Sequence, residues 1–589
     1  MMPQRAIASL LVVLFMTCAA RAQVLQQVPD DALLVIKTKD LTATSAKVGK
    51  LMKDLGLAQM KPGLDNPLAL IQKELGMSNG VNTAGEMAIV FRDPAKTNEK
   101  PDKSMLVLIP VSDYAAFVSN FKDAKVEGEV TEVSMPKGNE PGFIAQWGNY
   151  AALSPSKTVA GMKAGTPLKI GGDATNKELA GKDIVFYANM KALRTNLIPQ
   201  LQGVRDKAME EMEATNDANL AKFRPLIKSA AGQVFLAFES FLRDTDAATI
   251  SVDFGPEGMK VALMSEFIPD SYLGSTFAAV KNTSEPVLAG LPTGKYLFFG
   301  GYVNQPEVST KLLNDFIGPI MKELDTMGPE MKAAHDYVDA INTALKATKS
   351  ASFGVVAPSG QLGQEAIFQL MTVSKGDAAA LKASQVKMVK AQEETMKALG
   401  MPADAYSSTV NPAAKTVDGV TFDSIVTTMN PNSKDPAAMQ QANVMALLYG
   451  PGGVNMLQGE VNKDTFMMAM GVPDAVLQGA IAAAKTGEAP LVASPGVKAV
   501  ASHLPTNRTG ELYVPLDQII TTGLTYAKQF GAPLNVTIQP DLPPLGFATS
   551  TDGSALRIDG YIPTVLVQQL VSAGMQAWMQ TQGGGGGGL

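Results

Sequence analysis

The sequence predicts an α+β protein made of two tandem related units, each a largely antiparallel sheet with helices on one face. Two observations lead to this prediction. Short strand patterns follow one another in hairpins and meanders with helices between them, which is typical of antiparallel sheets covered by helices. In addition, "SEFIPDSYLG" at 265–274 is echoed by "DGYIPTVLVQ" at 559–568, so two similar stretches of chain end in the same way.

The first unit is expected over residues 23–284. A short apolar run at 33–36 predicts a buried strand, and the helical spacing that follows predicts a helix ending at Gly56. Ser112 or Asp113 is the expected N-cap of a later helix. The remaining predicted elements are strands at 86–91 and 104–111, a meander over 129–154, a strand running into a helix at 183–201, and a hairpin at 247–269.

The second unit, over residues 285–576, repeats this order of elements. Its predicted segments are a strand and helix at 295–324, strands at 351–360 and 365–374, a helix at 376–392, a meander at 415–429, a strand and helix at 510–530, and a hairpin at 545–563. The offsets between matching segments differ, which indicates an insertion around 375–510 in the second unit. The charged segment 203–223 is the expected insertion in the first unit and is predicted to be helical.

The first 22 residues have the layout of a signal peptide. Arg5 precedes an apolar stretch over 7–16, and small residues then lead to an expected cleavage between Ala22 and Gln23. The apolar stretch is too short to span about 30 Å of hydrocarbon, and Thr17 before Cys18 is unlike a lipoprotein signal. We therefore expect export to the periplasm or beyond, with no membrane span after cleavage.

Composition narrows the possible partners and chemistry. Cys18 is the only cysteine and lies in the segment that is expected to be removed, so the mature chain has no disulfide and no thiol nucleophile. The formal net charge is −6 and no basic run is present, so the sequence does not predict nucleic-acid binding. Six glycines near the end predict a flexible tail over 577–589.

Histidine chemistry has little support. His335 lies on a predicted helix and His503 just before a proline-containing loop, and neither accompanies a Gly-x-Ser-x-Gly motif. His503 is the better catalytic candidate because it is near a loop. For both residues, a hydrogen-bonded or solvent-facing histidine is the favoured interpretation, and two isolated histidines do not predict a metal site.

Three Ser-x-x-Lys matches, beginning at Ser119, Ser154 and Ser384, occur together with a Lys-Thr-Gly at 485–487. These short patterns are also found in penicillin-binding enzymes, where the serine opens a helix and the Lys-Thr-Gly lies on a strand. Here Ser119 and Ser384 fall inside predicted helices, and the Lys-Thr-Gly ends an alanine-rich helix. A serine–lysine enzyme is therefore not predicted.

Two groups of methionines, at 467–470 and at 209–212, raise the possibility of Cu(I) binding. Methionine also fills irregular cores, and the alternation around 466–470 suits a strand with methionine on both faces, so core packing is favoured. No Walker loop or calcium loop is complete. The sequence thus predicts no catalytic, cofactor-binding or metal residues, and no cofactor.

The segment Val28–Val35, "VPDDALLV", resembles the start of uncharacterised exported bacterial proteins that are grouped as a domain family of unknown function. The resemblance implies an envelope or extracellular location, and it implies no activity or site residues. Two hypotheses remain. The preferred one is a non-catalytic envelope protein that binds a partner, such as another envelope component, or an apolar or polymeric ligand. The alternative is a hydrolase that acts on envelope polymers through two carboxylates about 5–10 Å apart.

Overall fold

The computed structural model describes residues 23–583 except 136–139, 164, 215–222, 329–330, 359–365, 399–405, 430–435, 451–452 and 532–535. The expected signal peptide, 1–22, lies outside the described residues. The α+β class is confirmed, because antiparallel strands and helices alternate along the chain. Among the described residues, each helix is either too short or too polar to span a bilayer.

The chain divides into two compact units. Unit 1 comprises the residues up to Leu201 together with Glu239–Phe277 and Asp552–Ile558, and unit 2 comprises Gln202–Phe238, Ala278–Thr551 and the residues from Asp559 onward. Unit 1 therefore takes a short segment from near the end of the sequence.

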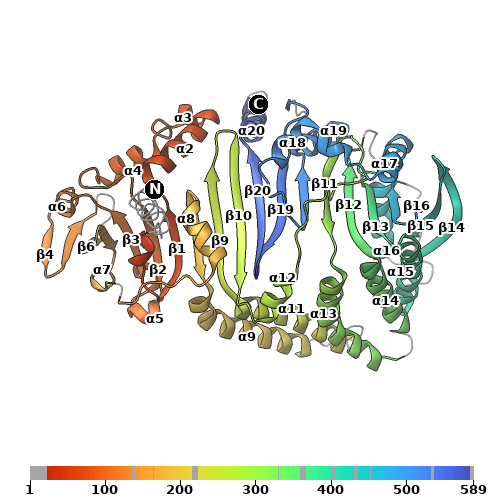
Figure 1. Ribbon diagram of the computed structural model, residues 1–589, viewed down its shortest axis with the longest axis horizontal. Helices are drawn as coiled ribbons and strands as arrows, with labels where there is room; N and C mark the ends of the chain where they lie inside the picture. Colours follow the sequence, from red (N-terminus) through yellow and green to blue (C-terminus); the bar gives the residue numbers. More distant parts are fainter. Residues whose placement is uncertain are drawn as a thin grey trace, which may run out of the picture. The chain divides into compact units, whose positions relative to one another are not determined.

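In unit 1, antiparallel strands pair in the order β4–β5–β6–β7–β3–β2–β1–β8–β9–β10 (Figure 1). Their bounds are β1 Ala32–Thr38, β2 Met87–Arg92, β3 Met105–Pro110, β4 Lys125–Glu127, β5 Val130–Ser134, β6 Pro141–Trp147, β7 Tyr150–Ser154, β8 Ile184–Asn189, β9 Thr245–Phe254 and β10 Gly258–Phe267. The first part of β20 (Ala555–Pro563) pairs with β10.

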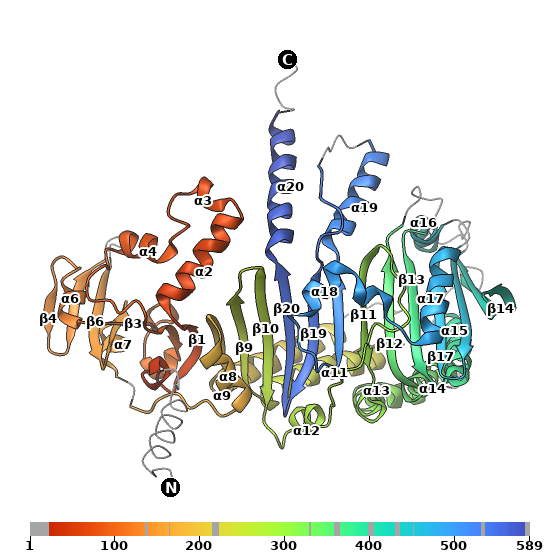
Figure 2. The ribbon, with the colours of Figure 1, turned by 45° about the horizontal axis from the view of Figure 1, so that its top comes forward.

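The short helices of unit 1 begin at the caps that the sequence provides. Helix α2 (Leu41–Asp54) is capped by Asp40 and packs beside α3 (Leu57–Met60) and α4 (Pro67–Leu75), as Figure 2 shows. Asp113 is the N-cap of α6 (Tyr114–Val118), which confirms one of the two expected caps. At the end of α6 the Ser119 hydroxyl donates to the Ala116 carbonyl.

Helices pack against both faces of the unit 1 sheet. Helices α7 (Lys157–Gly161) and α8 (Asp173–Gly181) lie on the face that carries Val35, Leu106 and Trp147. Helix α6 lies on the opposite face, over β3 and the strands from β5 to β7. The expectation of helices on one face was therefore wrong, because strands such as β3 are apolar on both sides.

Unit 2 contains its own run of antiparallel strands, in the order β19–β18–β11–β12–β13–β17–β16–β15–β14. Their bounds are β11 Tyr296–Val303, β12 Thr348–Val356, β13 Gln369–Gly376, β14 Tyr406–Val417, β15 Val420–Met429, β16 Val454–Asn462, β17 Thr465–Met470, β18 Gly510–Val514 and β19 Leu545–Asp552.

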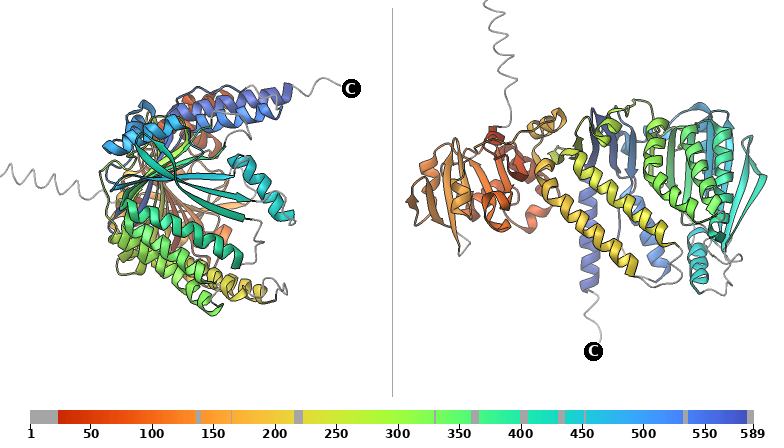
Figure 3. Two further views of the ribbon diagram at one scale, coloured as in Figure 1. Left: turned by 90° about the vertical axis from the view of Figure 1, so that its right-hand side faces the viewer. Right: turned by 90° about the horizontal axis from the view of Figure 1, so that it is seen from below.

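Helices also cover both faces of the unit 2 sheet. Phe466 of β17 packs on α15 (Ala378–Ala398), whereas the next residue, Met467, faces α17 (Asp474–Thr486). Figure 3 shows α15 beside α14 (Lys332–Ala347), which in turn packs on α13 (Pro306–Thr326). Met468 packs on the same side as Phe466, so methionine on both faces of this strand is confirmed.

The remaining helices include three that bear on the sequence predictions. Helix α9 (Met190–Ala214) runs through the first half of the charged segment 203–223, and α11 (Arg224–Asp244) begins directly after that segment. Helix α20 (Thr564–Gly583) continues past the expected start of the tail at 577, because Met, Gln and Ala there are good helix formers. Other helices are α5 Pro94–Thr97, α12 Tyr272–Ala278, α16 Pro436–Tyr449, α18 Pro495–Ala501 and α19 Leu516–Gln529.

Candidate functional site

One face of the unit 1 sheet, over strands β2, β1, β8, β9 and β10, contacts α8 and carries buried charges. Lys37 of β1 is 1% exposed; its ammonium lies 2.8 Å from a Glu86 carboxylate oxygen and donates to the Leu179 carbonyl of α8. Burial lowers the pKa of Lys37, and the hydrogen bond to Glu86 acts against that shift. We call this side the covered face.

Two further carboxylates hold α8 on the covered face. Glu178 of α8 is 4% exposed, forms an ion pair with Arg557 of β20 and accepts a hydrogen bond from the Ser251 hydroxyl of β9. Glu266 of β10 accepts from both the backbone N–H and the hydroxyl of Thr175, 2.9 and 2.6 Å away. Each of these charges therefore has a partner.

The opposite side of the same strands is apolar, and we call it the open face. Side chains alternate between the two faces along each strand, and Lys37, Val185 and Ser251 point to the covered face. The open face therefore carries Ile36, Phe186, Ile250 and Leu263. Phe186, Ile250 and Leu263 are 43%, 45% and 46% exposed, whereas Val185 is fully buried on the other side. Antiparallel sheets with a solvated face usually carry polar residues there, so this face departs from the common pattern.

The open-face side chains form two rows across the strands. The first row joins directly opposed residues from β2 to β10: Ile89, Ile36, Phe186, Ile250 and Leu263. The second row, two residues along each strand, consists of Phe91, Leu34, Ala188, Ala248 and Ser265. The first row is uniformly large, and the second becomes small over β8, β9 and β10.

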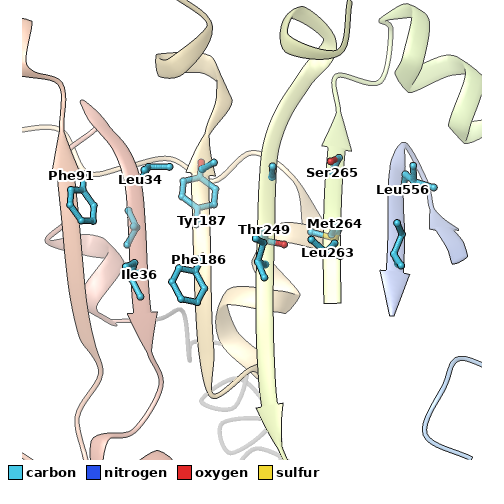
Figure 4. A pocket seen from close by; sticks show the side chains of 15 residues that line it. Leu34, Ile36, Phe91, Phe186, Tyr187, Thr249, Leu263, Met264, Ser265 and Leu556 are labelled. Carbon is cyan, nitrogen blue, oxygen red and sulfur yellow. The ribbon is translucent and has the colours of Figure 1, made fainter. Parts of the chain in front are cut away.

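A cavity of about 420 Å³ lies over both rows, and Leu556 and Ile558 of β20 complete its lining. Figure 4 shows its labelled side chains strung across the neighbouring strands, from Phe91 on β2 to Leu556 on β20. None of the described residues that line the cavity is acidic, basic or histidine. The site can therefore bind an apolar group through burial alone, without a fixed charge to orient it.

The polar atoms in the lining are few. Tyr187 is buried, and burial raises the pKa of its phenol, with Asp246 and Glu266 acting in the same direction. It is therefore a neutral phenol at physiological pH. Thr249 is buried, and Ser265 is a half-buried hydroxyl of the small row. None of these groups forms an acid–base pair in the cavity.

A pair of carboxyls lies outside the cavity, at the end of β9. Asp183 and Asp253 share a hydrogen bond, and the Lys47 ammonium of α2 lies 2.8 Å from Asp183 and 3.6 Å from Asp253. Burial alone would raise the pKa of Asp183, but hydrogen bonds from Lys47 and the Phe254 N–H hold it below its usual value. Burial, followed by the neighbouring Asp183, raises the pKa of Asp253.

This pair serves as a clamp more readily than as a catalytic dyad. Glycosidase carboxyls stand about 5–10 Å apart to admit a sugar or a water molecule, whereas these two are in direct contact. Asp183 also accepts a hydrogen bond from the Phe254 N–H at the end of β9. The pair thereby ties α2 to the sheet.

The structure keeps the two histidines apart from any cavity described above. His335 lies on α14, as predicted, with Nε2 2.9 Å from a carboxylate oxygen of Asp325. The ring of His503 stacks on Tyr561 with centroids 4.0 Å apart. Both histidines thus lie against neighbouring side chains.

The serines of the three Ser-x-x-Lys matches hydrogen-bond to the backbone or cap a helix. Ser384 is buried inside α15 and donates to the Ala380 carbonyl, and Ser154 ends β7 and donates to the Met105 carbonyl. Ser119 is the C-cap of α6. Lys485 and Thr486 end α17 before Gly487, as the sequence predicted.

The two groups of methionines differ in burial, since Met209 and Met212 are half-buried. Met467 is fully buried in the unit 2 core, which agrees with the packing interpretation, and Met209 and Met212 lie on α9. Within the described ranges, no group of three or more His, Cys, Asp or Glu is arranged to hold a metal ion.

Comparisons with known proteins leave the family open. No family model matches the chain, and no curated protein matches it. Among solved structures, crystal form III of TP0453 is similar at a TM-score of 0.20 and 11% identity, over 49% of this chain and 97% of that chain. Crystal form IV of TP0453 gives 0.20 and 12%, over 50% and 98%. TM-scores of this size support no argument about function.

Sequence reasoning missed the open face. The run from Ile184 to Ala188 is apolar at consecutive positions, which is typical of a strand buried on both sides. The signal that could have found it is the combination of such runs with hairpin connections, since antiparallel strands often leave one face uncovered.

Proposed function

We propose that this chain is an exported, non-catalytic envelope protein that binds an apolar ligand on the open face of unit 1. The observation that supports this proposal is the cavity of about 420 Å³, which lies over exposed Phe186, Ile250 and Leu263 and has no charged residue in its lining. Its volume is in the range of small-molecule sites, about 300–1,000 Å³.

Burial of the exposed apolar side chains favours the binding of a ligand on the open face. Burying apolar surface contributes about 25 cal/mol per Å², so covering several half-exposed large side chains stabilises a complex by several kcal/mol before binding costs. Contiguous exposed apolar surface on a folded protein commonly marks an interaction site. The exposed parts of these side chains contribute little to the stability of the fold, which supports a binding role.

Another hollow of unit 1, about 690 Å³, lies over β4, β5 and β6 and is less suited to such a ligand. Its lining includes Glu129 and Lys163, which pair with each other at 2.9 Å, so an apolar ligand there would meet a charged pair. The unit 1 open face is therefore the preferred site.

The carboxylate-dependent hydrolase is the less supported function. The Asp183–Asp253 contact leaves no space for a substrate between the carboxyls, and neither residue lines the open-face cavity. The binding function needs no such pair.

We also propose that the two units are tandem copies of one fold. The strand order of unit 1 from β9 to β4 becomes that of unit 2 from β19 to β14 when ten is added to each strand number. Within this order Val35 pairs with Tyr187, and Phe299 pairs with Tyr513, so each unit has a buried tyrosine at the matching position. Superposing the two strand sets in an experimental structure tests this proposal, and a mismatch in register would refute it.

A fluorescence titration tests the binding proposal. The chain from Gln23 onward is titrated with the neutral apolar dye N-phenyl-1-naphthylamine. We expect saturable binding that weakens about tenfold in Ile250→Gln, because a large part of the Ile contact is lost. Ile71→Gln is the matched control, since Ile71 is 53% exposed but lies on α4. No saturable binding by the unaltered chain, or equal weakening in both variants, would refute the proposed site.

A further inference from the structure

The open face contains a trough that is narrower than the cavity as a whole. Ala188, Ala248 and Ser265 lie directly opposite one another on β8, β9 and β10. Phe186, Ile250 and Leu263 stand beside them, two residues along the same strands and therefore about 7 Å away. Three small side chains thus form a floor next to a wall of three large ones.

The trough runs across the strands, and a leucine stands at each of its ends. Leu34 of β1 is directly opposite Ala188, and Leu556 of β20 lines the cavity on the other side of β10. With neighbouring strands about 4.8 Å apart, the distance from β1 to β20 across β8, β9 and β10 is about 19 Å. The space is therefore long across the strands and narrow along them.

The chemistry along the trough is uniform. The side chains on the open face are hydrocarbon except for the Ser265 hydroxyl on β10, next to the β20 end, since Tyr187, Thr249 and Met264 alternate toward the covered face. A charged ligand would lose its hydration without gaining a partner. A single hydroxyl at one end suits a neutral polar group at the end of a hydrocarbon.

From these observations we infer that the ligand is one unbranched alkyl or acyl chain with a neutral head group, lying across β8, β9 and β10 with its head toward Ser265. This inference rests on the proposed apolar-ligand function and names the class of ligand. An extended chain contacts the whole floor and the wall of large side chains, whereas a compact ring system of equal carbon number contacts only part of each.

Displacement of N-phenyl-1-naphthylamine by two alcohols tests the shape of the ligand. 1-Dodecanol and cyclododecanol have the same number of carbons and the same polar group, but one is linear and the other compact. We expect 1-dodecanol to displace the dye at least tenfold more effectively, and affinity to rise several-fold for each added pair of methylenes from octanol to dodecanol. Equal displacement by the two alcohols would overturn the linear-chain inference while leaving the apolar site in place. Absence of dye binding would instead refute the proposed function.

Two variants test the position of the chain. Ala248→Leu fills the middle of the floor and is expected to weaken 1-dodecanol at least tenfold, whereas Ala69→Leu, at an exposed position of α4, is the matched control. Leu34→Ala removes the stop at the β1 end, so the alcohol length at which affinity stops rising is expected to increase. Circular dichroism and a thermal melt confirm folding of each variant. Unchanged 1-dodecanol affinity in folded Ala248→Leu, or an unchanged length limit in folded Leu34→Ala, would overturn the inference.

Discussion

The two faces of the unit 1 sheet reverse the usual distribution of side chains. The covered face holds Lys37, Glu178 and Glu266 almost out of contact with water, whereas the open face exposes Phe186 and Ile250. Burying a charge is costly unless it is paired, and exposing a large apolar group forgoes the main stabilising term of folding. The comparison shows that the covered face holds its charges through partners on α8 and the neighbouring strands, whereas the open face leaves large apolar side chains partly in water.

The sharpest test of the covered face removes one partner from a buried pair. Glu178→Ala leaves Arg557 and the Ser251 hydroxyl without their carboxylate, and we expect a loss of about 3 kcal/mol in the free energy of unfolding. Urea denaturation measures this change. Glu129→Ala is the matched control because Glu129 forms an exposed pair with Lys163, and its removal should cost less than about 0.5 kcal/mol. Similar losses in both variants would break the contrast between buried and exposed charge.

Adjacent residues on β8 compare the two faces directly. Val185 is fully buried on the covered face and Phe186 is 43% exposed on the open face. We expect Val185→Ala to cost about 2 kcal/mol, from lost burial and a residual cavity, and Phe186→Ala to cost less than about 1 kcal/mol although more atoms are removed. Thermal or urea unfolding of the two variants checks the order. A larger loss for Phe186→Ala would show that the open face contributes to the core.

The carboxyl pair at the end of β9 predicts a pH effect of smaller size. The pKa of Asp183 is lowered in the folded protein, so its ionised form adds stability above an unfolded pKa of about 3.9, and that stability is lost as the pH falls through the folded pKa. The pKa of Asp253 is raised, so protonation of this carboxyl at a higher pH acts in the opposite direction. We expect Asp183→Asn to cost about 1 kcal/mol at pH 7 and to reduce the loss of stability below pH 4.

Urea unfolding as a function of pH measures this effect. Asp253→Asn is the matched variant, because it removes a like charge and should leave stability at pH 7 unchanged or slightly higher. If the free energy of unfolding falls equally below pH 4 in Asp183→Asn and in the unaltered chain, the contact between α2 and β9 does not depend on that charge.

Much of the strand content follows from local pattern. The alternation and turn residues around 247–269 predicted the β9–β10 hairpin, and "EMAIVF" predicted β2. Local patterns of this kind report whether a side chain is apolar, and antiparallel pairing follows from short connections.

The site could not be read in the same way. Lys37 looks like a surface residue in sequence, and its burial depends on Glu86 and on the Leu179 carbonyl, 142 residues away. Phe186 looks like a core residue, and its exposure depends on the absence of a helix over that part of the sheet among the described residues. Both outcomes are set by which helix packs on which face, and period-two alternation carries no such information when both faces are apolar.

The late segment in unit 1 has a consequence for biosynthesis. Strand β10 ends at Phe267, but its neighbour β20, with Leu556 of the cavity and Arg557 of the Glu178 pair, is made almost 300 residues later. At synthesis rates of roughly 5–20 residues per second, β10 is made on the order of 15–60 s before β20. An unpaired apolar strand edge is prone to aggregate. We therefore expect the nascent chain to need a chaperone that shields β10 until the residues around 557 emerge.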